Sequence, residues 1–430
     1  MAAVVKGKDT LLLKAYGKAD VEGTVPLTVD TVLPIGSVTK QFTAAAILQL
    51  RDQGKLSLDD DITKWLRDLE TRGNTVTLRH LLGHTSGIVD LTEMPELRAM
   101  KLMMNPTVTL DALYKVISRY PFQFPTGTMQ IYSNSGFWLL GLIIEKASGM
   151  TYEDYVQQKM FEPLGMTRSM YCNNSENIPR RAYRYGMRSG IPRRGPQIVH
   201  TGTYAAGPIC STAEDMVRWL QALHGGKVLS PKSYAEMITP SKLNDGTSLR
   251  YSMGLTVAED SRGFRYIGHN GGGFGFSSEA RWYSDAQLAV VVLTNSEPDA
   301  ITVATEDLAA AVLPAPRPAS PFTGDASLLI GKYTGLGPGG DTVIEVTQTP
   351  AGIALSIRGG PAAPLSWVED WTFRRSSSLL TFRRSASGGP APDLLFDTFG
   401  DHFILKRQEK AAWNCRFAAS PRRTPTACRR

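Results

Sequence analysis

The sequence contains little cysteine, with four residues in 430, at positions 172, 210, 415 and 428. None of them forms a C-x-x-C pair, which excludes the usual spacing of a zinc ribbon, and their wide separation gives no indication of a disulfide scaffold. A chain of this length can bury a large core without such cross-links. We therefore expect a fold that does not rely on its cysteines.

Long hydrophobic runs are also missing. The most apolar stretches, 136–144 and 288–293, are well short of the roughly 18 residues that a membrane-spanning helix needs. The first 17 residues include Lys6, Lys8 and Lys14 and lack the apolar run of a secretory signal. We expect a protein without a membrane span that is cytoplasmic as written, or periplasmic or secreted if an export signal is missing from the sequence.

The excess of positive charge is concentrated in the last 21 residues. These contain six lysines and arginines and no acidic residue, and without them the formal net charge of +7 falls to +1. The rest of the chain shows no basic face, so nucleic-acid binding is not expected. With 42% hydrophobic and 20% charged residues, the composition is that of an ordinary globular protein.

Several well-known catalytic patterns are absent. The chain has no G-x-S-x-G nucleophile turn, because the serine of 83–87 (GHTSG) stands one position late, and it has no Walker-type P-loop. His80 and His84 have the i, i+4 spacing of a zinc pair, but Leu81 stands where a metalloprotease would have glutamate. We therefore expect no metal and no cofactor.

The apolar pattern of residues 1–312 predicts one α/β (α+β) unit with a mainly antiparallel sheet. Strands at 4–5 and 11–16, joined by a glycine-containing turn, form a hairpin at the start. Apolar side chains at three- and four-residue spacing predict a helix from Ser37 that ends near Gly54. Further helices are expected at 77–82, 110–119, 134–147, 151–159, 213–224 and 300–312, and strands at 247–257, 264–267, 278–283 and 288–294.

A proline-rich stretch divides the chain. Residues 313–321 contain four prolines in nine positions, which is typical of a linker, and we place the linker at 313–326. From 327 to 408, short β-type runs alternate with turn residues, which predicts a small all-β barrel or sandwich. Residues 409–430 show no periodicity and are expected to form a disordered basic tail.

A serine and a lysine stand three residues apart at the start of the first predicted helix, in Ser37-Val-Thr-Lys40. Residues i and i+3 share a helix face, so the Lys40 amine can reach the Ser37 hydroxyl. A partly desolvated lysine has a lowered pKa and can activate a neighbouring hydroxyl. Standing alone, the tetrapeptide is more readily explained as a helix cap followed by a solvated lysine.

Two further segments accompany this pair. Tyr132 and Asn134 lie two residues apart at a predicted loop-to-helix junction. The segment His269-Asn-Gly-Gly-Gly273 is predicted to be a loop between two strands, and its glycines can bring backbone NH groups against a bound carbonyl. In this order, the three segments resemble the S-x-x-K, Y-x-N and [K/H]-[T/S/N]-G motifs of the serine β-lactamase and penicillin-binding protein superfamily.

The resemblance is to the branch that holds class C β-lactamases, D-alanyl-D-alanine carboxypeptidases, D-aminopeptidases and family VIII carboxylesterases. It covers about residues 4–312 and includes the segments 80–87 (HLLGHTSG), 162–167 (EPLGMT) and 211–215 (STAED). It implies a β-lactamase-like fold, and the β region looks like the lipocalin-like module that some members carry at their carboxyl end.

The resemblance implies a serine hydrolase that forms a covalent acyl-enzyme and needs neither metal nor cofactor. Ser37 would be the nucleophile, and Lys40 and Tyr132 would share the acid and base roles. The backbone NH groups of Ser37 and Gly272 would form the oxyanion hole. Substrate binding and orientation would be supported by Asn134, His269, Asn270 and Gly271.

His269 stands where class C β-lactamases resemble one another in having lysine. An imidazole of ordinary pKa, near 6.5, is mostly neutral at pH 7 and holds a β-lactam carboxylate less well than an ammonium does. We therefore rank small-molecule esters and D-amino-acid amides or peptides above β-lactams as substrates. The alternatives are a class C-type β-lactamase, a D-alanyl-D-alanine carboxypeptidase or, in another class, a penicillin-binding sensor that is acylated without turnover. The oligomeric state is left open.

Overall fold

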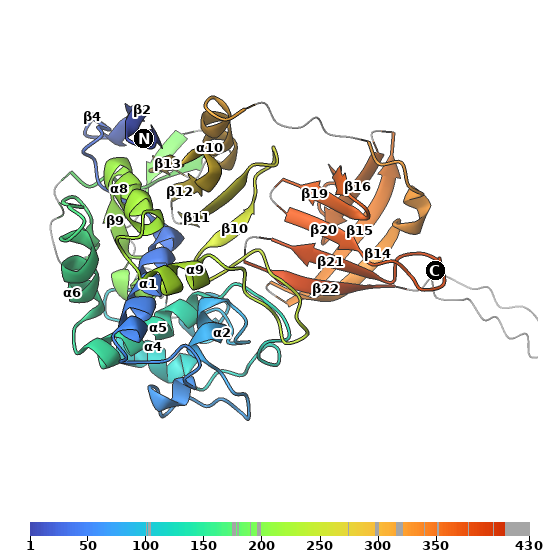
Figure 1. Ribbon diagram of the computed structural model, residues 1–430, viewed down its shortest axis with the longest axis horizontal. Coiled ribbons are helices and arrows are strands. Elements are labelled where there is room, and N and C mark those ends of the chain that lie inside the picture. Colours follow the sequence, from blue (N-terminus) through green and yellow to red (C-terminus); the bar gives the residue numbers. More distant parts are fainter. Residues whose placement is uncertain are drawn as a thin grey trace, which may run out of the picture.

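The structure is a computed structural model, shown in Figure 1. It describes residues 1–99, 101, 105–173, 178, 180–189, 191–195, 199–273, 275–296, 301–314, 321–338, 340–350, 352–376, 378–398 and 400–408. A body of helices and strands, formed by the residues up to 314, lies beside an all-β body formed by residues 321–408. The predicted basic tail lies outside the described residues.

A six-stranded antiparallel sheet forms one side of the larger body, as the sequence predicts. Its order is β10, β11, β12, β13, β1, β2, so β1 pairs with its hairpin partner β2 and also with the much later strand β13. The bounds are β1 Ala2–Lys6, β2 Asp9–Lys14, β10 Thr256–Glu259, β11 Arg265–Gly273, β12 Phe276–Tyr283 and β13 Leu288–Thr294.

Helices cover both faces of this sheet. On β13, Val291 belongs to the large core that includes α8 (Ala213–His224), whereas its neighbour Val290 packs in a separate cluster with Ala309 of α10 (Ile301–Ala310). Successive side chains of a strand point to opposite faces, so α8 and α10 lie on opposite sides. This explains why β13 is apolar throughout rather than alternating.

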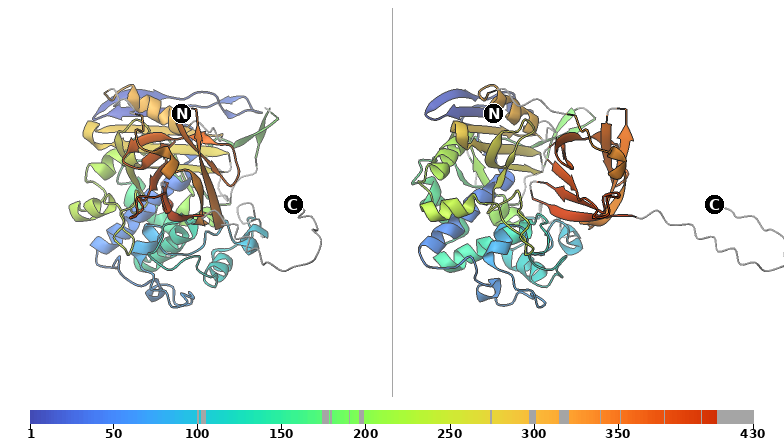
Figure 2. Two further views of the ribbon diagram at one scale, coloured as in Figure 1. Left: turned by 90° about the vertical axis from the view of Figure 1, so that its right-hand side faces the viewer. Right: turned by 45° about the vertical axis from the view of Figure 1, so that its right-hand side comes forward.

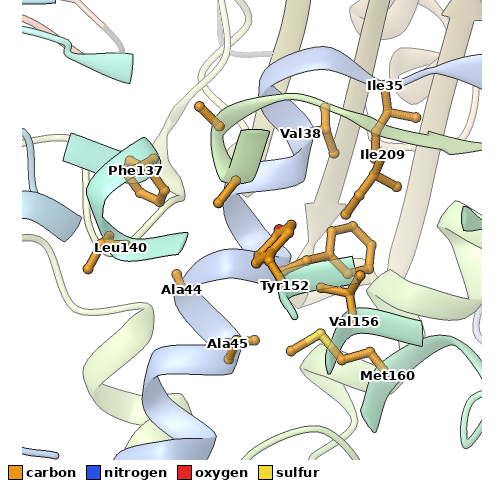
Figure 3. Close-up of a cluster of buried hydrophobic side chains, with 14 of the residues drawn as sticks. Ile35, Val38, Ala44, Ala45, Phe137, Leu140, Tyr152, Val156, Met160 and Ile209 are labelled. Carbon is orange, nitrogen blue, oxygen red and sulfur yellow. The ribbon is translucent and has the colours of Figure 1, made fainter. Parts of the chain in front are cut away.

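The helical half of the larger body surrounds α1 (Thr39–Asp52), which is buried over most of its length. Figure 3 shows its small residues Ala44 and Ala45 among the larger side chains of Tyr152 and Val156. The other helices are α2 Leu78–Leu82, α3 Pro95–Ala99, α4 Leu110–Ile117, α5 Asn134–Ser148, α6 Tyr152–Val156, α7 His200–Thr203 and α9 Pro231–Met237. Single turns are η1 Gly36–Val38, η2 Ile62–Lys64, η4 Gln157–Phe161, η5 Tyr204–Ala206, η6 Ser284–Ala286 and η7 Ala326–Leu328.

A short three-stranded sheet brings two cysteines together. In it, β9 (Ile209–Ser211) pairs with β5 (Leu33–Pro34) and with β6 (Met170–Tyr171). Cys172 follows β6 directly and forms a disulfide with Cys210 of β9, with the Cα atoms 5.6 Å apart. The expectation that the fold does not rely on its cysteines is wrong for this pair, because strand pairing joins positions whose separation of 38 residues carries no local signal. Cys415 and Cys428 lie outside the described residues.

Two sequence-based assignments in the sheet region are wrong. Of the strand predicted at 247–257, only the last two residues belong to β10, and the rest makes isolated bridges such as Lys242 to Ser248. The segment 269–273, predicted as a loop, is the second half of β11 and pairs with β12 as far as Gly273 and Phe276. Its glycines indicated a turn, but in the structure they allow close backbone packing.

Residues 321–408 form the all-β region that the sequence predicts. Nine strands make one antiparallel sheet that curls into a nearly closed barrel (Figure 2) around a core that includes Tyr333, Phe373 and Leu405. The strands are β14 Gly331–Gly337, β15 Gly340–Thr349, β16 Gly352–Ile357, β17 Ala363–Pro364, β18 Ser366–Glu369, β19 Thr372–Arg375, β20 Ser378–Phe382, β21 Asp393–Asp397 and β22 His402–Arg407. The linker at 313–326, of which residues 315–320 are outside the described part, stays a prediction.

Two hairpins complete the larger body. One consists of β3 and β4 near the start of the chain, and the other of β7 and β8, which lie between Cys172 and Cys210 in sequence. Their bounds are β3 Lys18–Asp20, β4 Val25–Pro26, β7 Tyr185–Arg188 and β8 Ile191–Arg194.

Candidate active site

Ser37 lies in the turn η1, directly before α1. This turn packs tightly on β11: a Cβ atom on Gly271 would lie 2.2 Å from the Ile35 carbonyl oxygen and 2.9 Å from the Ser37 nitrogen. The Ser278 hydroxyl of β12 donates to the same Ile35 carbonyl at 2.7 Å. A side chain at position 271 would therefore push β11 away from Ser37.

Lys40 is fully buried, and its Nζ has three oxygen neighbours: Ser37 Oγ at 3.2 Å, Asn134 Oδ1 at 2.8 Å and the Ala206 carbonyl at 2.9 Å. Burial lowers the pKa of Lys40 to about 7, while the Asp90 carboxylate acts in the opposite direction. A neutral amine has two N–H bonds and one lone pair, and carbonyl oxygens can only accept. When neutral, Lys40 donates to the two carbonyl oxygens, and its lone pair faces the Ser37 hydroxyl.

Asp90 orients Asn134 and was not singled out from the sequence. One of its carboxylate oxygens accepts hydrogen bonds from the backbone N and from Nδ2 of Asn134, the latter at 3.0 Å. The amide is thereby turned so that Oδ1 faces Lys40. Asp90 lies three residues beyond the segment 80–87, and no local pattern relates it to the start of α5, 44 residues later.

Tyr132 lies in the loop before α5, with the centre of its ring 4.8 Å from Lys40 Nζ. Its hydroxyl approaches Ser37 and is enclosed, but it has no hydrogen bond of ordinary geometry with any described residue. Burial raises the pKa of Tyr132 well above its usual value, so the phenol is protonated at neutral pH. The His84 ring lies 4.3 Å behind the Tyr132 ring, and its Nδ1 accepts a hydrogen bond from Ser133 N at 3.2 Å.

His269 is buried on the interior face of β11. Its Nδ1 donates to the Asn270 carbonyl oxygen, and its Nε2 accepts from the Tyr251 hydroxyl at 3.0 Å. Burial lowers the pKa of His269 to about 3, and the nearby Lys40 ammonium acts in the same direction. The imidazole is therefore neutral in the range from pH 5.5 to 8 and supplies no positive charge, which goes further than the sequence expectation of an ordinary imidazole pKa.

A pocket of about 120 Å³ opens in front of Ser37. Its wall includes Ser37, Asn134 and the backbone of Gly271, Gly272 and Gly273. Lys40, Tyr132 and His269 are not among the described wall residues and stand behind them. The structure thus brings the three sequence motifs to one pocket: each motif contributes a residue to the wall, and Lys40, Tyr132 and His269 lie behind it.

The comparison with known proteins identifies the family. The model of the Beta-lactamase family matches residues 1–313. The chain belongs to the beta-lactamase family. As a member of this family, it is an enzyme of the serine hydrolase class, whose chemistry is acylation of the serine.

Individual relatives in the beta-lactamase family include penicillin-binding proteins and aminopeptidases. The chain is 30% identical over 308 residues to Penicillin-binding protein 4* of Bacillus subtilis, which covers 68% of this chain and 67% of that protein. It is 29% identical to a D-aminopeptidase of Brucella anthropi over 71% of this chain, and it spans only 57% of that protein. The solved structure of the octameric penicillin-binding protein homologue from Pyrococcus abyssi has a TM-score of 0.64 and 26% identity, and the match covers 94% of this chain and 95% of that one.

In this beta-lactamase family member, the barrel reaches the active site. Asp401, in the turn between β21 and β22, accepts a hydrogen bond from Tyr132 N at 2.8 Å. Gly400 lies so close to Tyr132 that a Cβ atom would come within 2.5 Å of the ring. Gln130 and His402 exchange two backbone hydrogen bonds, of 3.1 and 2.8 Å, beside this contact. Sequence reasoning missed Asp401, because 269 residues separate it from Tyr132.

Replacing Asp401 with alanine should lower kcat about tenfold, because the buried Tyr132 N–H loses its acceptor and the ring loses its support. Asp401→Asn should keep most of the activity, since an amide oxygen also accepts a hydrogen bond. Steady-state kinetics on one ester substrate, with thermal unfolding of each variant, measures the effect. The matched control is Asp393→Asn on the same barrel, where the carboxylate pairs with Lys406 instead. Equal losses in Asp401→Asn and Asp401→Ala would contradict this role.

No cluster of three or more histidine, cysteine, aspartate or glutamate side chains suited to a metal ion occurs in the described part of the chain. His80 and His84 do not act as a pair: the Nδ1 atom of His80 accepts a 3.1 Å hydrogen bond from Thr77 N at the start of α2, whereas His84 packs on Tyr132. Among the helices that the structure describes, none combines the length and the apolar character needed to cross a membrane.

Proposed function

We propose that this serine hydrolase cleaves short esters and D-amino-acid amides or peptides through an acyl-enzyme on Ser37. The observation that carries the proposal is the Lys40 amine, which is half neutral near pH 7 and stands 3.2 Å from the Ser37 oxygen. A base whose pKa lies near the working pH is the most effective in proton transfer.

Acylation begins when Ser37 Oγ attacks the substrate carbonyl carbon and its proton passes to Lys40 Nζ. The resulting tetrahedral oxyanion would be held by the backbone NH groups of Ser37 and Gly272. The close packing of β11 on η1 supports this assignment, because it brings the backbone of Gly272 to the same wall as Ser37. Asn134 and Asp90 keep the lysine in place during the transfer.

The leaving alkoxide or amine then needs a proton. Tyr132 is enclosed between Ser37 and Lys40, and its raised pKa keeps the phenol protonated, so it is suited to donate a proton and to recover one from Lys40. This assigns the base role mainly to Lys40 and the acid role mainly to Tyr132. Water attacks the acyl-enzyme by the reverse of the same proton path and releases Ser37.

The proposed substrate preference rests on the neutral His269. The buried imidazole is neutral, and its two nitrogens are hydrogen-bonded to the Asn270 carbonyl and the Tyr251 hydroxyl. It therefore offers neither a charge nor a free donor to a β-lactam carboxylate. Esters and amides do not need that contact at the third motif. The similarity to a D-aminopeptidase favours amides of D-amino acids within this class.

The proposal is tested by assaying one enzyme preparation with a short p-nitrophenyl ester, a D-amino-acid p-nitroanilide and a chromogenic cephalosporin. We expect multiple turnovers of the ester or the anilide, with kcat/KM at least about tenfold above that of the cephalosporin. Preferred turnover of the cephalosporin would favour the class C-type β-lactamase alternative. A burst of one equivalent without turnover on all three would identify a penicillin-binding sensor, and either result would overturn the proposal.

A further inference from the structure

A second cavity adjoins the catalytic pocket. It has a volume of about 280 Å³ and shares Pro34, Thr203, Gly207 and Phe276 with the wall of the pocket in front of Ser37. A substrate held at Ser37 can therefore extend into it past these residues. We refer to this cavity as the arginine recess, because Arg181, Arg184 and Arg194 line it.

The backbone that carries the arginine side chains of the recess is hydrogen-bonded to the body of the protein. Ala182 N donates to the Val32 carbonyl at 3.0 Å, and Tyr183 N donates to the Ala19 carbonyl at 2.9 Å. Tyr185 N is held by the Asn295 carbonyl at 3.0 Å. The backbone that carries Arg181 and Arg184 is thus bonded to three separate parts of the fold, so these side chains start from fixed positions.

Two glycines and one tyrosine place the guanidinium groups. A Cβ atom on Gly195 would lie 2.2 Å from Arg184 Nε, and one on Gly275 would lie 3.1 Å from Arg184 Cβ, so Arg184 fits between two backbone segments without side chains. The Arg194 guanidinium lies 3.1 Å from the centre of the Tyr183 ring. A stacked guanidinium keeps its N–H edge free to bind an anion.

The charge of the arginine recess is of one sign. No aspartate or glutamate is among the described residues that line it. The sequence from 180 to 195 contains six arginines and no acidic residue. Asp20, which interacts with Arg194, is partly exposed and is not among the residues that line the recess. Burial lowers the pKa of Arg181, and the Tyr183 hydroxyl acts in the opposite direction. A bound anion would therefore stabilise the charged form of this guanidinium.

The arginine recess is distinct from the position of His269. Phe276, which lines the recess, is the first residue of β12 and pairs with Gly273 at the end of β11, whereas His269 is the middle residue of β11. Four residues of strand from His269 to Gly273 correspond to about 13 Å at 3.3 Å per residue. A carboxylate in the recess is therefore not the one that a third-motif cation would hold.

We propose that the arginine recess binds a carboxylate of the substrate and so selects anionic esters or amides over neutral ones. The proposal rests on the proposed function, because it names the substrate class of the same site. Paired N–H groups of arginine match the two oxygens of a carboxylate, and the contact is stronger in a partly enclosed site than at an open surface.

Matched pairs of esters test the proposal. One pair, p-nitrophenyl valerate and mono-p-nitrophenyl glutarate, differs by a carboxylate on the acyl side; the other, phenyl valerate and 3-carboxyphenyl valerate, differs by a carboxylate on the leaving group. We expect wild-type kcat/KM to favour the anionic member of one pair at least about tenfold. Arg181→Gln should remove most of that preference and change the neutral ester less than about twofold.

A control and a second variant keep the outcome clear. Arg193→Gln changes an exposed arginine of β8 that does not line the recess and should leave the preference intact. If Arg181→Gln does not fold, the exposed Arg194→Gln decides in its place, and 0.5 M NaCl should reduce the preference in wild type.

If Arg181→Gln leaves the ratio of kcat/KM between the anionic and the neutral ester unchanged in both pairs, the arginine recess is not a carboxylate site. The same holds if the variant loses activity equally on neutral and anionic esters. If neither an ester nor the D-amino-acid anilide is turned over, the proposed function fails instead. The recess is then judged by calorimetric titration of wild type and Arg194→Gln with monomethyl glutarate: weaker binding to the variant supports the carboxylate site, and equal or absent binding overturns it.

Discussion

Replacing Ser37 with alanine should abolish hydrolysis of every substrate, with a loss of at least about 10⁴-fold in kcat. The nucleophilic oxygen is removed, and among the described hydroxyl groups only that of Ser37 is hydrogen-bonded to Lys40 Nζ. The fold should remain intact, because the Ser37 side chain makes no cap hydrogen bond and loses only its contacts with Lys40 and the Tyr132 hydroxyl. Steady-state kinetics measures the loss, and thermal unfolding should show a change of no more than about 1 kcal/mol.

Covalent labelling gives this prediction an independent control. Intact-mass analysis after treatment with a fluorophosphonate should show one adduct on wild type and none on Ser37→Ala. Ser86→Ala is the matched variant, because Ser86 is the serine of the GHTSG segment and its hydroxyl caps Ile88 N instead. It should still be labelled. An adduct that persists on Ser37→Ala would show that the nucleophile is elsewhere.

Lys40→Met and Tyr132→Phe should each lower kcat by at least about 100-fold. The methionine fills the buried space of Lys40 but leaves Ser37 without a base, and the phenylalanine keeps the ring against His84 but removes the phenolic proton. Since both side chains belong to one proton path, the double variant should lose much less than the product of the two single losses. A strictly multiplicative loss would show that they act independently.

The pH profile separates the two roles. Protonated Lys40 cannot accept the Ser37 proton, so kcat/KM of wild type should fall as the pH drops below about 7, the pKa of this lysine, and should level off above it. Lys40→Met should lose this acidic limb in its residual activity. An acidic limb that is unchanged in Lys40→Met would belong to another group, and His269 is a poor candidate because its pKa of about 3 lies far below pH 7.

Elements that depend on local pattern were predictable from the sequence. The helices at α1, α5 and α8 and the strands β12 and β13 were found close to their observed positions, because period and caps are local properties. The order of the motifs linked Ser37, Lys40 and Tyr132, and the structure brings these three side chains together, with Ser37 in the pocket wall and the other two behind it.

What the sequence could not supply are contacts made across long separations. Asp90, Asp401 and the disulfide between Cys172 and Cys210 act only because distant segments meet, and each has an ordinary local setting. The glycines around Gly271 led to a wrong loop prediction, because a run of glycines usually indicates a turn. Here Gly271 lies within a strand, and its tight packing against Ile35 and Ser37 excludes a side chain. In both cases, the physical cause is a neighbour that the one-dimensional pattern does not show.

The long-range contacts of β1 and Asp401 also set the order in which a newly made chain can become active. β1 leaves the ribosome well before its pairing partner β13, whose Val292 pairs with Ala2. Likewise, Tyr132 is synthesised well before Asp401 of the barrel, which accepts its backbone hydrogen bond. At about 5 to 20 residues per second, the nascent chain spends roughly tens of seconds with this sheet open and the hydrolytic machinery incomplete. Translation therefore delays activity until the barrel has emerged, and a product that terminates before the barrel would carry Ser37 and Lys40 without the contact that positions Tyr132.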